Sequence, residues 1–257
     1  MSSLITGIIL VKNEEKHIFN CVKSLNFCDE ILIINDNSTD KTVELITKLN
    51  NKKVKIVPFV LEGDFSKARN FGLSKARGDW IFFIDADEQV PPSLAFEISN
   101  VISNWANKMG NEYSGFYIRR FDSMWGRKLR YGESGIKLLR LAKKNAGEWV
   151  GKVHEEWKID GRIGVLKNSI DHYPHQSIGE FLREINFYTD IRSIELKSKK
   201  TKIYFWSILA YPLGKFIVNF IFKRGFLDGI HGLIFAINMS FHSFLVRGKL
   251  WLVWNKK

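Results

Sequence analysis

The sequence predicts an α/β fold in which a mostly parallel central sheet carries helices on both faces. Short apolar runs alternate with helical segments over residues 5–105. The runs are apolar throughout, which is typical of strands that are buried on both faces of a sheet. The chain has 257 residues and is 45% hydrophobic, enough for one large domain or for one domain and an appendage.

The elements follow one another in strand–helix order. The expected strands cover residues 5–11, 30–35, 53–58 and 80–85, and a further strand begins at Gly115. The expected helices cover residues 18–25, 38–49, 65–76, 91–105 and 178–197, where apolar residues recur at helical spacing. Residues 121–175 have poor periodicity and scattered glycines, so loops and short strands that line a site are expected there.

The two cysteines and the amino terminus predict a cytoplasmic protein. Cys21 and Cys28 lie seven residues apart in a segment expected to be helical, a spacing that fits neither a disulfide framework nor a metal site. We expect two packed thiols in a reducing compartment. The first residues, MSSLITGIILVKNEE, have neither a cationic leader before the apolar run nor a small-residue cleavage site after it.

The net charge of +12 is concentrated in the carboxyl-terminal part of the chain. Residues 196–257 hold eleven Lys or Arg and the single acid Asp228. The same segment is strongly apolar and aromatic, a combination that suits an anionic membrane surface better than a nucleic acid. We therefore predict a main domain over residues 1–195 and a basic, helical, membrane-associated extension over residues 196–257, without nucleic-acid binding.

The extension is expected to lie along the membrane instead of crossing it. Residues 229–246 contain no Asp, Glu, Lys or Arg, and these eighteen residues are the lower limit for a spanning helix. A span would bury polar side chains such as His231, Asn238 and His242, whereas the apolar residues recur on one broad face. The alternative is that these helices pack on the main domain or on a second subunit of a homo-oligomer.

Three carboxylates lie at and just after the end of the strand expected at residues 80–85, in IFFIDADE. In open parallel sheets ligands bind at the carboxyl ends of the strands, where Asp85 and Asp87 lie. Residues i and i+2 of an extended segment point the same way, so both carboxylates could converge on one cation, or on one ribose and one cation. Mg²⁺ takes one or two protein carboxylates together with water and phosphate oxygens, so the spacing fits a nucleoside diphosphate held through a metal. An acidic turn that caps the helix after Pro91 is the alternative.

Two further residues are expected at the same edge of the sheet. Asp36 ends the second expected strand, and its carboxylate could accept a hydrogen bond from a nucleotide base or sugar. Arg69 lies on the helix before the acidic strand, from which it could reach a diphosphate or hold Asp85 and Asp87 in place. A surface position is the alternative for Arg69.

Together these segments resemble the family 2 glycosyltransferases, which have the Rossmann-like type A nucleotide-sugar fold. The resemblance is carried by ILVKNEE, NDNSTD and FSKARNFGLSKARGDWIFFIDADE in the first 100 residues. Three later segments are similar to the branch that includes lipopolysaccharide-core β-1,4-glucosyltransferases: RLAKKNAGEWVGKVHEEWKIDGRIG, IDHYPHQSIGEFLREINFYT and RGFLDGIHGLIFA. One departure is Asn35, where the family commonly has Asp.

The resemblance implies which residues bind the donor. Asn13 and Glu14, in ILVKNEE, would contact the nucleotide sugar. Asp36 would contact the nucleotide base, and Asp85 the ribose or the metal side. Asp87 would hold Mg²⁺ or Mn²⁺ against the diphosphate.

The resemblance also implies where the acceptor is activated. His154 and Glu155 fall where such enzymes carry their catalytic acidic residue, and His172 where a late histidine often completes the metal or diphosphate site. Transfer with inversion needs a base for the acceptor hydroxyl and stabilisation of the departing nucleoside diphosphate. We expect Glu155 to be the base, with His154 orienting it or replacing it. The alternatives are a surface ion pair for Glu155 and a structural role for His172.

The predicted function is metal-dependent, inverting transfer of a hexose from a nucleoside diphosphate sugar, in the first place a UDP-sugar. The acceptor would be a hydroxyl of a lipid-linked glycan or of the lipopolysaccharide core. The protein would meet this acceptor as a peripheral protein on the inner face of a bacterial membrane. A peptide or polysaccharide-carrier acceptor is one alternative. A membrane-surface nucleotide-binding module without catalysis is another.

Overall fold

The computed structural model of the protein describes residues 3–106, 113–151, 155–174 and 176–255. The chain forms two compact units. The sheet unit consists of Met1–Arg120 and Ile136–Tyr173, and the helical unit of Phe121–Gly135 and Pro174–Lys257. These units differ from the expected division at residue 195, because the helix over residues 178–198 and the segment 121–135 both belong to the helical unit.

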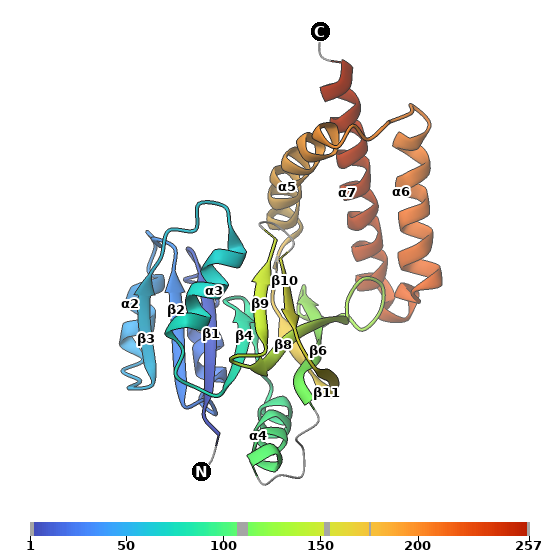
Figure 1. Ribbon diagram of the computed structural model, residues 1–257. Coiled ribbons are helices and arrows are strands. Elements are labelled where there is room, and N and C mark those ends of the chain that lie inside the picture. The colour runs from blue at the N-terminus through green and yellow to red at the C-terminus, as the bar shows by residue number, and fades with distance from the viewer. Residues whose placement is uncertain (1–2, 107–112, 152–154, 175, 256–257) are drawn as a thin grey trace. The chain divides into compact units, whose positions relative to one another are not determined.

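One large mixed sheet forms the centre of the sheet unit (Figure 1). Its strands lie in the order β3-β2-β1-β4-β8-β6-β11-β5, and β7 pairs with β6. The bounds are β1 Ile5–Val11, β2 Glu30–Asn35, β3 Val54–Pro58, β4 Trp80–Asp85, β5 Glu88–Gln89, β6 Tyr113–Met124, β7 Arg127–Lys128, β8 Ile136–Lys143 and β11 Arg162–His172. A separate two-stranded sheet pairs β9 (Gly147–Val150) with β10 (Glu156–Ile159).

The sheet is parallel over its amino-terminal half and antiparallel beyond it. β3, β2, β1 and β4 pair in parallel, with β1 between β2 and β4. β8 then joins β4 antiparallel, and β6 joins β8 in the same sense. The expected α/β fold is confirmed, and its parallel part is limited to the four strands that the apolar runs predicted.

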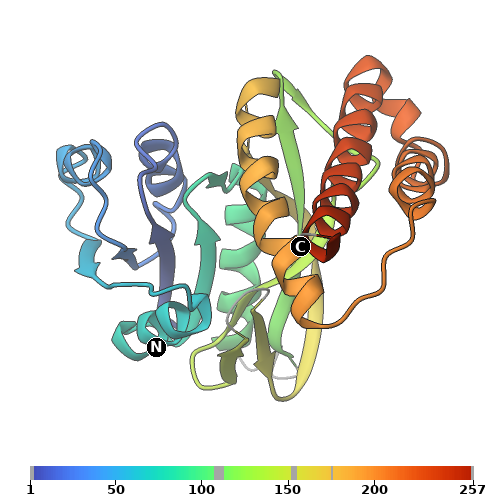
Figure 2. The same cartoon turned by 90° about the horizontal axis from the view of Figure 1, so that it is seen from above.

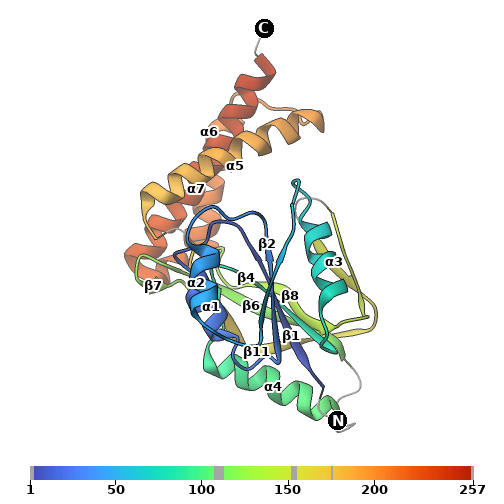
Figure 3. The ribbon, with the colours of Figure 1, turned by 90° about the vertical axis from the view of Figure 1, so that its left-hand side faces the viewer.

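Helices cover both faces of the parallel strands, as Figures 2 and 3 show. α1 (Ile18–Ser24), α2 (Thr42–Lys48) and α4 (Pro92–Ala106) lie on one face, and α3 (Phe65–Lys75) lies on the other. Successive strand residues enter opposite cores: Phe82 packs with α1 and α4, whereas Phe83 packs with α3 and the β9–β10 hairpin. Burial on both faces explains why the residues inside β1, β2 and β4 are almost all apolar.

Local sequence signals set the bounds of α3 and the start of β4. The Asp64 side chain accepts a hydrogen bond from the Lys67 backbone N–H at 3.1 Å and so caps the helix. After the helix, Gly78 passes so close to β1 that a Cβ there would lie 2.6 Å from the Thr6 backbone nitrogen. Only glycine fits so close to β1, and this close contact allows the chain to enter β4 beside β1.

The segment expected to hold only loops and short strands is more regular than predicted. β8 and β11, with 8 and 11 residues, are full members of the central sheet. Both strands carry several charged residues and lack the continuous apolar run of β4, because parts of their faces are exposed. β8 is the strand that brings Arg140 next to β4.

Both cysteines are free, fully buried thiols, which confirms the prediction of packed side chains. Cys21 lies in α1 and its Sγ donates to the Asp85 backbone carbonyl at 3.4 Å. Burial raises the pKa of both thiols, so neither is a thiolate at neutral pH.

The helical unit contains three long helices. α7 (Gly229–Asn255) packs against both α5 (Ile178–Ser198) and α6 (Ser207–Ile217). A π-helical turn at Val218–Phe222 and a 3-10 turn at Gly225–Asp228 connect α6 to α7. Asp228, the only acid of the tail, accepts hydrogen bonds from the Arg130 and Tyr131 backbone N–H groups at 2.9 Å. This buried carboxylate therefore ties the 121–135 segment to the tail.

One helical stretch of the described residues, Gly225–Asn255, is long and apolar enough to cross a membrane, with a mean hydropathy of 1.4. Large apolar side chains of α6 and of the turns that follow it are also exposed. The attachment mode that the sequence suggests, along the surface instead of across it, stays a prediction.

Candidate functional site

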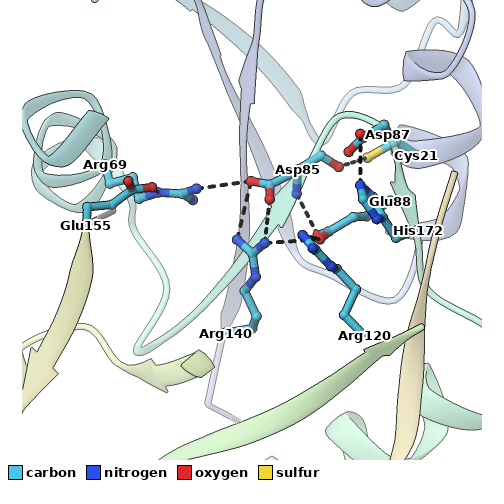
Figure 4. Close-up of polar contacts among 9 residues, drawn as sticks. All are labelled: Cys21, Arg69, Asp85, Asp87, Glu88, Arg120, Arg140, Glu155 and His172. Atoms are coloured by element: carbon cyan, nitrogen blue, oxygen red, sulfur yellow. Dashed lines mark hydrogen bonds and ion pairs between the residues drawn. The ribbon is translucent and has the colours of Figure 1, made fainter. Parts of the chain in front are cut away.

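The site begins at the carboxyl end of β4, where two arginines bind Asp85. Arg140 of β8 donates from Nη1 to Oδ1 at 3.3 Å and from Nη2 to Oδ2, and Arg69 of α3 donates from Nη2 to Oδ1 at 3.0 Å. Figure 4 shows the carboxylate between the two guanidinium groups. Burial alone would raise the pKa of Asp85, but the charges of Arg140 and Arg69 outweigh it and hold that pKa well below its usual range. Asp85 is therefore an anion at neutral pH.

Glu88 is a second buried carboxylate that binds Arg140. Its Oε1 accepts from Arg140 Nη2 at 3.0 Å and from Arg120 Nη1 at 3.4 Å. Its Oε2 accepts from the backbone N–H of Asp85 at 2.9 Å. Burial raises the pKa of Glu88 despite the opposing charge of Arg140. Arg140 is thus fixed between two carboxylates, which determines the orientation of Asp85.

Asp87 has a different partner, His172 of β11. The Nε2 atom of His172 lies 3.1 Å from Asp87 Oδ2, and the backbone N–H of Tyr173 donates to the Asp87 carbonyl at 2.8 Å. Burial would raise the pKa of Asp87, but the hydrogen bond and charge of His172 outweigh burial and lower it. The pair places a carboxylate oxygen beside an imidazole nitrogen, and both atom types are common metal ligands.

The structure corrects the geometry expected for the acidic motif. Ala86 and Asp87 form a turn, so Asp85 and Asp87 are not alternate residues of one extended strand. Asp85 contacts the arginines and Asp87 contacts His172, as Figure 4 shows. The hydrogen bonds of these carboxylates also argue against the alternative of an acidic turn that caps the next helix.

Arg69 joins Asp85 to Glu155. Its Nε donates to Glu155 Oε1 at 3.0 Å, and its Cζ lies 4.5 Å from the ring centroid of Trp149. Arg69 is only 6% exposed, so the alternative of a surface arginine is wrong. Glu155 directly precedes β10 and its side chain is 15% exposed. His154, the other residue expected to act on the acceptor, lies outside the described residues.

Asp36, Asn13 and Glu14 lie at the ends of β1 and β2. Asp36 accepts from Lys12 Nζ at 2.8 Å and from the Leu61 N–H at 3.1 Å, and despite burial these contacts lower its pKa. Asn13 has a left-handed φ of 55°, and its Oδ1 accepts from the Thr39 N–H at 2.7 Å. The Glu14 N–H donates to Thr42 Oγ1 at 2.8 Å. These residues hold the loop after β2, and their contact with a nucleotide stays a prediction.

A cavity of about 720 Å³ belongs to the helical unit, and a cavity of about 640 Å³ belongs to the sheet unit. The cavity of the sheet unit is lined by Arg69, Asp85, Arg140 and Glu155 together with the aromatic side chains of Tyr117, Trp149 and Trp157. Asp36, Asp87 and His172 lie outside this lining. The structure thus brings Arg69, Asp85 and Glu155 together, and it pairs Asp87 with His172 close by.

Sequence reasoning missed Arg140 and gave no role to Glu88. Arg140 is the one charged residue in the run LLRLA of β8, and it is 4% exposed. A cation inside an apolar strand needs a buried anion, because an unpaired buried charge is strongly destabilising. That signal could have assigned Arg140 to the acidic end of β4.

The comparison with protein families finds a match in the amino-terminal half of the chain. The model of the family described as glycosyl transferase family 2 matches residues 6–131. Residues 6–131 thus belong to glycosyl transferase family 2. The matched residues include the four parallel strands, Asp36, Arg69, Asp85 and Asp87.

Two curated glycosyltransferases are similar over almost the whole chain. An uncharacterized glycosyltransferase of Rickettsia typhi is 26% identical over 258 residues, which cover 96% of this chain and 86% of that protein. The lipopolysaccharide core biosynthesis glycosyltransferase LpsC of Rhizobium meliloti is 24% identical over 259 residues, which cover 96% of this chain and 92% of LpsC. The likeness to these two glycosyltransferases therefore includes the helical unit.

A solved glycosyltransferase shows the same fold. The mannosyltransferase PcManGT of Pyrobaculum calidifontis, solved with GDP-mannose and Mn²⁺, aligns with a TM-score of 0.55 at 12% identity. The alignment covers 100% of this chain and 89% of that chain. The family 2 domain of this protein thus has the type A nucleotide-sugar fold that the sequence suggested.

Proposed function

We propose that this family 2 glycosyltransferase transfers a hexose, with inversion, from a nucleoside diphosphate sugar to a hydroxyl of a lipid-linked or lipopolysaccharide-core acceptor. A UDP-sugar is the first donor to test. The observation that carries the proposal is the bridge that Arg69 makes between Asp85 and Glu155 on the wall of one cavity. The name of the relative LpsC supports the acceptor class.

The cavity offers donors to an anionic leaving group. Arg69 Nη1 and Arg140 Nε are buried and have no hydrogen-bond partner among the described residues. Trp149 and Trp157 also line the cavity, and their Nε1 atoms are likewise buried without a hydrogen-bond partner among the described residues. Oriented N–H groups in a partly desolvated cavity stabilise negative charge that develops on a departing diphosphate.

The Asp87–His172 pair fits a divalent metal. One carboxylate oxygen and one imidazole nitrogen lie side by side, and among the described residues no group of three or more His, Cys, Asp or Glu side chains is arranged to hold a metal ion. Two protein ligands are typical where substrate phosphates and water complete the shell, so Asp87 and His172 would hold Mg²⁺ or Mn²⁺. When bound, such a metal would supply positive charge that stabilises the leaving group. PcManGT, whose fold is similar, was solved with Mn²⁺.

Glu155 is the proposed base for the acceptor hydroxyl. Arg69 binds only one of its oxygens in the described contacts, at Oε1, and fixes the carboxylate on the cavity wall. From there Glu155 would accept the hydroxyl proton as the acceptor oxygen attacks the sugar. The same guanidinium group holds Asp85, so base and donor site share one positioning residue.

The helical unit suits attachment to a membrane surface. Several of its large apolar side chains are more than half exposed, among them Phe205, Leu209, Leu213, Ile221 and Phe222. The tail is also strongly basic, so hydrophobic burial and attraction to anionic lipids would act together. We propose a peripheral protein on the inner face of the membrane, which meets a lipid-linked acceptor and a soluble donor.

The test is slow hydrolysis of the donor by the full-length protein across a panel of UDP-, GDP- and ADP-sugars. We expect one or a few sugars to be hydrolysed with Mg²⁺ or Mn²⁺, and Asp87→Ala to abolish the reaction. Transfer to lipopolysaccharide-core oligosaccharide would then be followed by NMR for the anomeric configuration of the product. Absence of binding and hydrolysis for every sugar, with and without metal, would refute the enzymatic function.

A further inference from the structure

The helical unit holds a large cavity that the transfer reaction does not use. Its volume is about 720 Å³, which is in the range of small-ligand sites. Side chains of α5, α6, α7 and the 121–135 segment line it, all within the helical unit. Its lining combines apolar and cationic side chains.

The charges of the lining favour an anion. Among the described residues, three cationic side chains line the cavity, Arg192, Lys215 and Arg247, with one carboxylate, Glu133. Lys215 already binds Glu133 at 2.5 Å, and Arg192 binds Glu195 at 2.6 Å. These two pairs leave the charge of Arg247 in excess.

Arg247 has no carboxylate partner among the described residues. Its Cζ lies 4.1 Å from the ring centroid of Tyr211, and its Nε is buried without a hydrogen-bond acceptor in the described structure. A buried N–H group without an acceptor costs free energy, and a phosphate oxygen would remove that cost. The ring of Tyr211 orients the guanidinium group inside the cavity.

His242, which also lines the cavity, does not add a competing charge. Burial lowers the pKa of His242, and the charge of Lys215 lowers it further, so the imidazole is neutral at pH 7. The remaining walls are largely apolar and include Leu196, Val218 and Val246. The cavity therefore offers one unsatisfied guanidinium group next to a surface for a hydrocarbon chain.

We propose that this cavity binds a membrane lipid through its phosphate, with the first part of the hydrocarbon chain against the apolar wall. Arg247 offers a positive charge that complements a phosphate, and α6 of the same unit exposes apolar side chains that would contact a membrane. Both features favour a membrane lipid as the ligand. The proposal rests on the proposed membrane attachment only for the source of the lipid. It predicts a saturable site for one lipid per chain, in addition to general attraction to an anionic surface.

The cavity is tested by titrating the full-length protein with octyl phosphate below its micellar concentration, followed by calorimetry. We expect binding of one octyl phosphate per chain, at least about tenfold tighter than binding of 1-octanol or of inorganic phosphate. Arg247→Gln should weaken binding about tenfold, whereas Lys202→Gln, which removes the charge of an exposed tail lysine outside the cavity, should leave it unchanged. Equal affinity for octyl phosphate and 1-octanol, or for octyl phosphate and inorganic phosphate, would overturn the proposal.

A second variant fills the cavity without removing any contact. Gly214 of α6 lines the cavity, and a Cβ there would meet no heavy atom within 4 Å. Gly214→Leu should therefore fold, with a raised melting temperature, and lose octyl phosphate binding. Gly248→Leu is the matched control, because Gly248 of α7 has the same open space but lies outside the cavity lining. Unchanged binding by Gly214→Leu would contradict the proposal.

Vesicles separate the lipid site from attachment as such. On phosphatidylcholine vesicles that contain phosphatidic acid, Gly214→Leu should sediment less than the wild type, and Gly248→Leu should sediment as much. If octyl phosphate binds but Gly214→Leu sediments normally, the ligand is a soluble phosphate ester and the membrane source is wrong. If the wild type sediments with no vesicle, membrane attachment fails, and the octyl phosphate titration still decides whether the cavity binds an alkyl phosphate.

Discussion

Arg140 of β8 donates hydrogen bonds to both carboxylate oxygens of Asp85 of β4. Both partners lie where neighbouring antiparallel strands meet, and Arg140 also binds Glu88 at 3.0 Å. Removing one partner of a buried ion pair leaves the other charge without compensation. The pair therefore links the stability of the sheet unit to the orientation of the proposed donor site.

We predict that Arg140→Ala lowers the free energy of unfolding by about 3 kcal/mol, because Asp85 and Glu88 then lose their common cation. Arg140→Lys should lie between the wild type and Arg140→Ala, since an ammonium group keeps the charge but not the forked geometry. Urea denaturation followed by circular dichroism measures both variants. Arg119→Ala, at an exposed position of the neighbouring strand β6, is the control and should change stability by less than about 0.5 kcal/mol.

The early part of the fold could be predicted because its signals are local. β1, β2 and β4 contain continuous apolar runs that are followed by helical periodicity, and their observed bounds match the predicted ones. β8 and β11 were missed because their charged residues interrupt the apolar pattern. Residues 121–135 are grouped with the tail because Asp228 accepts hydrogen bonds from Arg130 and Tyr131. These partners are nearly 100 residues apart in sequence, so a local sequence pattern could not predict the contact.

The site could be predicted in its composition but not in its pairing. The position of Asp85 and Asp87 at the end of β4 follows from the sequence, yet the turn at Ala86 separates their partners. Arg69 was expected to reach Asp85, whereas its second bond, to Glu155, joins residues 86 apart in sequence. Such pairs are set by how strands and hairpins meet, which is a property of the folded sheet.

The second prediction concerns Glu155 as the base. Glu155→Gln should lower kcat by about 10² to 10⁴, the usual contribution of a general base, with a much smaller effect on the KM of the donor. Initial rates with a fixed acceptor and varied donor measure both constants. Glu148→Gln, at an exposed position of β9, is the matched control and should keep wild-type rates. A normal kcat for Glu155→Gln would assign the proton transfer to another group.

The third prediction concerns the pH dependence of the Glu133–Lys215 pair in the helical unit. Burial would raise the pKa of Glu133, but the hydrogen bond and charge of Lys215 outweigh it and lower that pKa below the ordinary value of 4.5. A carboxyl with a lowered pKa in the folded state stabilises above its unfolded pKa, and this contribution is lost as the pH falls through the folded pKa. Glu133→Gln should therefore be less stable than wild type by about 1 kcal/mol at pH 7, and the two should become equally stable once the pH falls below the folded-state pKa of Glu133.

Denaturant titrations at several pH values measure that difference. A difference in stability between wild type and Glu133→Gln that does not shrink as the pH falls from 7 to well below 4.5 would show that the ion pair does not cause it.

The fourth prediction concerns membrane attachment. Leu209 and Phe222 of the helical unit are 68% and 75% exposed, and Phe96 of α4 in the sheet unit is 70% exposed. Leu209→Asp and Phe222→Asp should each weaken co-sedimentation with anionic vesicles by about tenfold or more, because each removes apolar contact and adds a repelled charge. Phe96→Asp carries the same kind of change outside the tail and should sediment like wild type. Equal losses for all three variants would remove the tail as the attachment surface.

The central claim is that Asp87 and His172 hold a divalent metal that binds the diphosphate of the donor. The most direct measurement is calorimetric titration of wild type and Asp87→Ala with UDP, in Mn²⁺ and in EDTA. The account predicts that Mn²⁺ strengthens UDP binding to wild type by at least about tenfold and has little effect on Asp87→Ala. Wild-type binding that is equal in Mn²⁺ and EDTA, or an Asp87→Ala variant that keeps the full effect of Mn²⁺, would contradict it.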